Sequence, residues 1–101
     1  MIELTGKQKR RLRSLGQRLQ ASVTVGKGGP SQEWLTNLSA LLARHELVKV
    51  KLPAAASRER EAMAEELAGQ TGSACAGVLG RTALLYRPSP DLPADQRIRL
   101  D

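Results

Sequence analysis

Segments with helical spacing and segments with strand spacing alternate along this chain, and their order constrains the fold more than any single motif. Apolar residues recur at helical spacing in residues 5–20, 31–45 and 57–71. Alternating or β-branched apolar residues occupy residues 22–25, 46–52, 74–79 and 82–87. Strands that alternate with helices predict parallel neighbours joined by right-handed crossovers. We therefore expect an α/β fold in the order α-β-α-β-α-β-β, with one mixed four-stranded sheet covered by helices.

Capping residues predict where the helices begin and end. Thr5 and Gln8 have the spacing of a capping box at the start of the first helix. Ser31 and Ser57 are predicted to cap the second and third helices, and Gly72 to end the third. Within the first helix we expect a buried stripe, formed by Leu12, Leu15 and Leu19. The pair Gly80-Arg81 between two apolar runs predicts a type II′ hairpin.

The stretch "ELVKVKL" at residues 46–52 alternates cleanly and predicts a strand with one buried face. Val48, Val50 and Leu52 should lie on one face, and Leu47, Lys49 and Lys51 on the other. The end of the chain differs, because residues 88–101 hold three prolines and few apolar side chains. We expect one domain over residues 1–88 and an extended, mobile tail over residues 89–101.

Composition excludes several classes of protein. No apolar run approaches the roughly 20 residues that span a bilayer, and the basic N-terminal stretch has no apolar segment typical of a signal peptide. The single cysteine, Cys75, excludes an internal disulfide and a metal site built from several cysteines. We expect a monomeric cytoplasmic protein that binds no membrane.

Positive charge is concentrated in the first third of the chain. The whole protein has a net charge of +6, yet residues 4–32 hold no acidic residue. The basic residues of that stretch are Lys7, Lys9, Arg10, Arg11, Arg13, Arg18 and Lys27. A cluster of this kind attracts polyanions. A solvated helix face that aids solubility is the alternative explanation.

Three glycines and a lysine lie where the first strand should end and the second helix begin, in "VTVGKGGPSQ". A nucleotide-binding P-loop is excluded, because no Lys-Ser or Lys-Thr pair follows the last glycine. A dinucleotide fingerprint begins well at Gly26 and Gly28 but meets Ser31 where its last glycine belongs. The third candidate is a G-x-x-G loop from Gly26 to Gly29, which clamps a nucleic-acid backbone in KH-type RNA binders. Taken alone, the four-residue pattern could also be a turn.

Four stretches together resemble the CRM-domain family (chloroplast RNA splicing and ribosome maturation) in its single-domain bacterial, YhbY-like form. They are "LTGKQKRRLRSLG" at 4–16, "VGKGGPS" at 25–31, "HELVKVKL" at 45–52 and "VLGRTALLYRP" at 78–88. The resemblance implies a fold similar to the C-terminal domain of translation initiation factor three, with a KH-like GxxG loop. It also implies binding to ribosomal RNA of large-subunit precursors and a role in ribosome assembly.

The residues expected to bind RNA come from the loop, the basic helix and two strands. They are Gly26, Lys27, Gly28, Gly29, Lys7, Lys9, Arg10, Arg13, Lys49, Lys51 and Arg87. Trp34 and Tyr86 are the only aromatic residues, too few for a stacking platform, which favours recognition of RNA backbone and shape. We expect no catalytic residue, cofactor, metal or small-molecule substrate. The alternative function is a protein–protein adaptor whose basic face binds an acidic partner.

Overall fold

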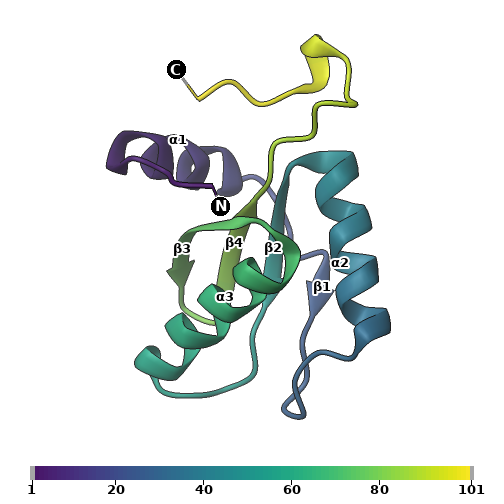
Figure 1. Ribbon diagram of the computed structural model, residues 1–101. Coiled ribbons are helices and arrows are strands. Elements are labelled where there is room, and N and C mark those ends of the chain that lie inside the picture. Colours follow the sequence, from purple (N-terminus) through teal and green to yellow (C-terminus); the bar gives the residue numbers. More distant parts are fainter. Residues whose placement is uncertain (1, 101) are drawn as a thin grey trace.

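A computed structural model describes residues 2–100 and shows three layers (Figure 1). In chain order the elements are α1 (Gly6–Gly16), β1 (Val23–Thr24), α2 (Gln32–His45), β2 (Leu47–Lys51), α3 (Ser57–Thr71), β3 (Ala74–Leu79), β4 (Thr82–Tyr86) and the 3-10 helix η1 (Ala94–Gln96). The predicted fold class is therefore confirmed: three α-helices cover one mixed four-stranded sheet. None of the helices in residues 2–100 has the length and apolar character needed to cross a bilayer.

The strand order is β1-β2-β4-β3, which differs in one respect from the expected parallel arrangement. β1 pairs with β2 in parallel, as predicted. β2 and β3 also run in the same direction, but they are not neighbours, because β4 lies between them and pairs antiparallel with both. A helical connection leaves room for one strand to insert between the two that it joins, and the sequence pattern contains no signal for this insertion.

Two hydrophobic clusters hold the layers together, one on each face of the sheet. On one face, α2 and α3 pack against the sheet through buried residues that include Leu38, Leu42 and Leu67. On the other face, Leu12 of α1 packs against Leu47, Ala76, Leu84 and Tyr86. The predicted alternation of β2 is confirmed, since Val48, Val50 and Leu52 belong to the first cluster and Leu47 to the second.

α1 is shorter than predicted. The capping box of Thr5 and Gln8 is present, but the helix ends at Gly16, and Leu19 is 39% exposed instead of completing a buried stripe. Gly16 lies directly on β4: a Cβ at this position would be 2.9 Å from Leu84 Cδ2. Glycine is also a weak helix former. α1 therefore ends at a residue that packs closely on the sheet, and the connection to β1 begins there.

Most of the other predicted boundaries are confirmed. Ser31 caps α2, and Gly72 ends α3 in a left-handed conformation with a φ of 67°. Gly80 has a φ of 59° between the paired residues Leu79 and Thr82, as a type II′ hairpin requires at its first loop position. The predicted cap at Ser57 is wrong. Ala56 occupies the N-cap position without a side-chain hydrogen bond, and Ser57 is already helical.

The tail was expected to be mobile, but the structure anchors it beside α1 (Figure 1). Ile98 and Leu100 pack against the cluster around Leu12, and the carboxylate of Glu46 accepts hydrogen bonds from the tail. The reason is a local alternation that the prolines obscure. In residues 97–100 two apolar side chains face the protein, and the intervening residues are exposed.

The phenol of Tyr86 gives a direct test of this packing. Burial raises the pKa of Tyr86 above its usual 10.0, and the nearby Glu46 carboxylate raises it further, whereas Arg97 lowers it. Because the folded state favours the neutral phenol, its contribution to the free energy of unfolding is complete below pH 10 and declines as the pH rises through the folded pKa. Ultraviolet titration of this single tyrosine should give a higher midpoint in the native than in the denatured protein. Equal midpoints would contradict the burial.

Candidate nucleic-acid interface

The loop between β1 and α2 is a tight turn with an exposed backbone. The amide of Gly29 donates to the carbonyl oxygen of Gly26 at 3.1 Å, which closes a four-residue turn around Lys27 and Gly28. All four residues are exposed. In Figure 1 the loop is the segment between the labels β1 and α2, at the lower end of the molecule.

Only one of these three glycines is needed by the conformation of the loop. Gly29 has a φ of 84°, which other residues rarely adopt. Gly26 and Gly28 do not have positive φ, and a Cβ at either position would meet no atom within 4 Å. Neither backbone strain nor internal packing therefore explains glycine at these two positions. Their effect is on the outer surface, where a bare backbone allows a ligand to approach closely.

α2 begins directly after this loop and adds amide donors to it. The first amides of a helix have no intrahelical acceptor. The hydroxyl of Ser31 accepts from the amide of Trp34, so this cap satisfies one of them and leaves the amides of Gln32 and Glu33 for an outside group. The indole of Trp34 donates to the carbonyl oxygen of Thr24 at 3.0 Å, which fixes the helix start to the end of β1. The acidic side chain of Glu33 in the first turn partly offsets the positive end of the helix.

Lys49 and Lys51 lie on the face of the sheet that carries α1. Lys51 is exposed and pairs with Thr24, and its carbonyl oxygen accepts from the amide of Val25. It is therefore tied to the residue that precedes the glycine loop. The ammonium group of Lys49 donates to the carbonyl oxygen of Leu19 at 2.9 Å, which uses one of its three protons.

The basic residues of α1 lie apart from the loop. α1 packs on β3, β4 and β2, whereas the loop follows β1 at the opposite edge of the sheet. Lys7, Lys9 and Arg10 are exposed. The guanidinium group of Arg13 donates to the carbonyl oxygen of Ala76 at 3.0 Å on the free edge of β3. The structure thus gives two basic regions, with the two lysines of β2 placed between them.

Arg87 is the one predicted site residue that the structure assigns to a different role. Its Nη1 donates to Ser39 Oγ at 2.9 Å and to the carbonyl oxygen of Thr71 at 2.8 Å, and its Nη2 donates to the carbonyl oxygen of Ser39 at 2.7 Å. These donors join the end of β4 to both α2 and α3. Arg87 therefore has a structural role, because three of the five donors of its guanidinium group are used inside the protein.

Sequence reasoning missed two arginines of the tail, which the fold brings beside a third arginine on α1. Arg97 and Arg99 lie beside Arg11 of α1, whose Nε donates to the carbonyl oxygen of Arg99 at 3.3 Å. The signal that could have located them is the alternation of basic and apolar residues in "RIRL", residues 97–100.

Within residues 2–100 no group of three His, Cys, Asp or Glu side chains could hold a metal ion.

Comparison with known proteins identifies relatives over most of this length. The family model of the CRS1/YhbY (CRM) domain matches residues 4–87 of this chain. A probable RNA-binding protein of Pseudomonas aeruginosa is 37% identical over 89 residues, which cover 88% of this chain and 86% of the relative. A probable RNA-binding protein of Bacillus subtilis is 34% identical over 88 residues, covering 87% and 92%. The solution structure of a hypothetical protein from Staphylococcus aureus aligns with a TM-score of 0.84 at 32% identity, covering 98% of this chain and 100% of that chain.

Proposed function

Because this chain belongs to the CRS1/YhbY (CRM) domain family, we propose that it binds RNA through its glycine loop, used as a KH-like GxxG clamp on the backbone. Two relatives are named as probable RNA-binding proteins. The net charge of +6 and the exposed lysines beside the loop suit a polyanionic partner.

The observation that carries this proposal is the pair of glycines at positions 26 and 28. The free protein has room for a side chain at both, and neither needs a positive φ. A phosphate that approached the turn would meet bare backbone, the free amides at the start of α2 and the ammonium group of Lys27. We assign Lys51 to the same contact and the exposed cations of α1 to a second one, with Lys49 between them.

The RNA that we propose is ribosomal RNA in precursors of the large subunit, with the protein acting in ribosome assembly. This step is supported by the resemblance of four stretches of the sequence, at residues 4–16, 25–31, 45–52 and 78–88, to the family. The proposed mechanism is binding without catalysis, in the cytoplasm. Recognition would depend on RNA backbone and shape, since Trp34 is committed to the start of α2 and Tyr86 is buried.

The charge reversal Lys27→Glu tests the loop. We expect it to weaken binding to a transcribed fragment of large-subunit ribosomal RNA by about tenfold or more, because an exposed lysine is replaced by a carboxylate beside a phosphate. Filter binding over a range of salt concentrations measures both affinity and slope. For about five contacted phosphates, log affinity should fall against log salt with a slope of about −3.5 for single strands, and less steeply in the variant.

Arg44→Glu is the matched control, since Arg44 is exposed in the last turn of α2, at the opposite end of that helix. It makes the same change in net charge and should alter affinity much less than Lys27→Glu. Equal losses in both variants would show that only net charge matters and would remove the loop from the proposal. If the folded wild-type protein failed to bind the RNA at all, the proposal of RNA binding would fail, and the adaptor function would become the better explanation.

A further inference from the structure

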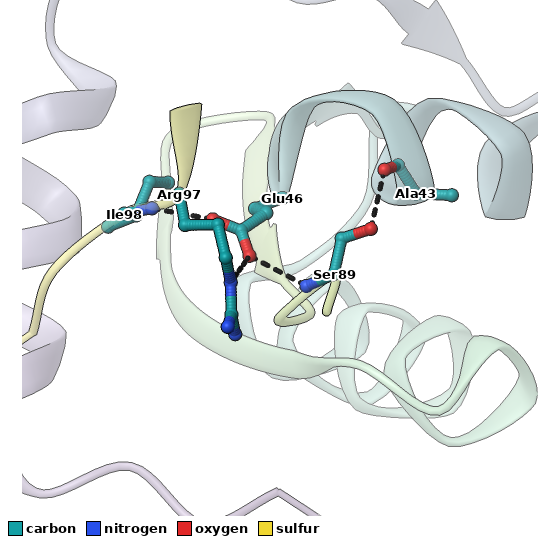
Figure 2. Close-up of polar contacts among 5 residues, drawn as sticks. All are labelled: Ala43, Glu46, Ser89, Arg97 and Ile98. Carbon is teal, nitrogen blue, oxygen red and sulfur yellow. Dashed lines mark hydrogen bonds and ion pairs between the residues drawn. The ribbon is translucent and has the colours of Figure 1, made fainter. Parts of the chain in front are cut away.

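The tail lies outside the part of the chain that the family model matches, although the related Staphylococcus aureus structure aligns over 98% of this chain. The family match ends at residue 87, whereas the anchored tail continues through residue 100. Two apolar side chains, those of Ile98 and Leu100, hold it on the face that carries α1. The buried carboxylate of Glu46 holds it a second time, by accepting from the amides of Ser89 and Ile98 at 2.6 Å each (Figure 2).

This anchoring creates a pocket of about 420 Å³ between α1 and the tail. Its charged lining consists of Arg11, Arg97, Arg99 and a single acid, Asp95. Arg11 is held in place by its bond to the carbonyl oxygen of Arg99. Arg97 uses only its Nε on Glu46, at 3.5 Å, and Figure 2 shows its two terminal nitrogens pointing away from that carboxylate. Its side chain is 40% exposed.

Three guanidinium groups around one pocket repel one another unless an anion joins them, and Asp95 together with Glu46, which pairs with Arg97, offsets only part of that charge. Guanidinium groups present planar, paired donors that fit the oxygens of a phosphate. The pocket also lies along α1, whose outer residues Lys7 and Arg10 are exposed and basic. Carboxylate ligands would fit the charge, but a phosphate within a polyanion would also use these neighbouring cations.

We propose that the pocket between α1 and the tail, lined by Arg11, Arg97 and Arg99, binds a backbone phosphate of the RNA, so that the tail extends the RNA-binding surface beyond the family domain. This inference rests on the proposed function. It assigns the tail an active part in binding, in addition to its part in covering the sheet.

Arg99→Ala tests the pocket with little risk to the fold, because the fold uses the carbonyl oxygen of Arg99, which the variant keeps. With the ribosomal RNA fragment as probe, we expect affinity to fall about three- to tenfold and the salt slope to become shallower by about 0.7, the contribution of one phosphate contact on a single strand. Arg58→Ala is the control, since this exposed arginine lies on α3, which covers the other face of the sheet. It should change neither quantity appreciably.

The outcomes separate this inference from the function on which it rests. Wild-type protein that does not bind the RNA contradicts the proposed function itself. Wild-type protein that binds, with Arg99→Ala unchanged in affinity and slope at an unchanged melting temperature, overturns the pocket alone. Parallel titrations with inorganic phosphate and with the RNA, each monitored by NMR of the tail amides, test whether the pocket binds free phosphate only. Shifts with inorganic phosphate but none with RNA would also overturn the RNA assignment.

Discussion

Replacing Glu46 with alanine should lower the free energy of unfolding by about 3–5 kcal/mol, which is the effect expected for removing one partner of a buried charged network. The carboxylate is fully buried and accepts from the amides of Ser89 and Ile98 and from the guanidinium group of Arg97. Without it, the amides of Ser89 and Ile98 in the tail lose their acceptors (Figure 2). Chemical denaturation of the wild-type protein and the variant measures the difference.

Replacing Glu46 with glycine isolates a second contribution to stability, the cost of the backbone conformation at this position. Glu46 is the one residue other than glycine with a positive φ, 65°, within residues 2–100. Such a conformation costs on the order of 1–3 kcal/mol for a residue with a side chain. Glu46→Gly loses the same hydrogen bonds as Glu46→Ala but relieves this strain, so it should be the less destabilised of the two. The opposite order would contradict the strain.

The exposed acid Glu66 on α3 provides the control for both variants. Glu66→Ala should change the free energy of unfolding by no more than about 0.5 kcal/mol, as is usual for surface positions. If Glu46→Ala behaved like Glu66→Ala, the carboxylate would not hold the tail, and the pocket beside α1 would lose its structural basis. Faster proteolysis in the tail of Glu46→Ala is the accompanying expectation, because local opening there becomes easier.

Arg87→Ala should lower the free energy of unfolding by about 2–4 kcal/mol, since a hydrogen bond to a charged group contributes about 1.5–3 kcal/mol net of exchange with water, and water can reach acceptors at this half-buried site once the side chain is removed. The side chain makes three such bonds, to Ser39 on α2 and to Thr71 at the end of α3. Denaturant unfolding measures the effect. Arg44→Ala serves as the control, because that arginine is exposed on α2.

Arg87→Lys distinguishes the two roles considered for this residue. A lysine keeps the positive charge but presents a point charge instead of a fork, so it cannot satisfy acceptors on two helices at once. We expect an intermediate loss of stability and, in the folded protein, unchanged affinity for RNA. Weaker RNA binding by a variant that remains as stable as the wild-type protein would restore Arg87 to the binding surface.

The sequence predicted elements well wherever the signal is local. The side chains of Thr5 and Ser31 bond to amides three residues further on, and Gly72 ends its helix through its own backbone conformation. Capping patterns in the sequence were therefore enough to find all three. The alternation of β2 placed Lys49 and Lys51 on the correct face. The end of α1 at Gly16 was harder to predict, because the close contact at Gly16 is with Leu84 of β4, a residue far along the chain.

In the candidate site, too, local features could be predicted from the sequence, and features that depend on distant residues could not. The turn from Gly26 to Gly29 and its position before α2 follow from the sequence, although the role assigned to it remains a prediction. The use of Arg87 inside the protein could not be predicted, since an arginine that directly follows a strand looks the same in the sequence whether it faces solvent or two helices. The arginines of the tail were missed because the prolines before them are typical of a disordered segment.

For this chain, local patterning determined which segments are helices and strands, which face of each is apolar, and where a bare glycine turn meets a helix start. The tertiary structure alone decided that β4 separates β2 from β3, that Arg87 joins two helices, and that the tail lies against α1. The physical reason is distance along the chain: Glu46 bonds to residues 43 and 52 positions away. Propensities and caps act over a few neighbouring residues, whereas partners so far apart meet only when the whole chain has packed.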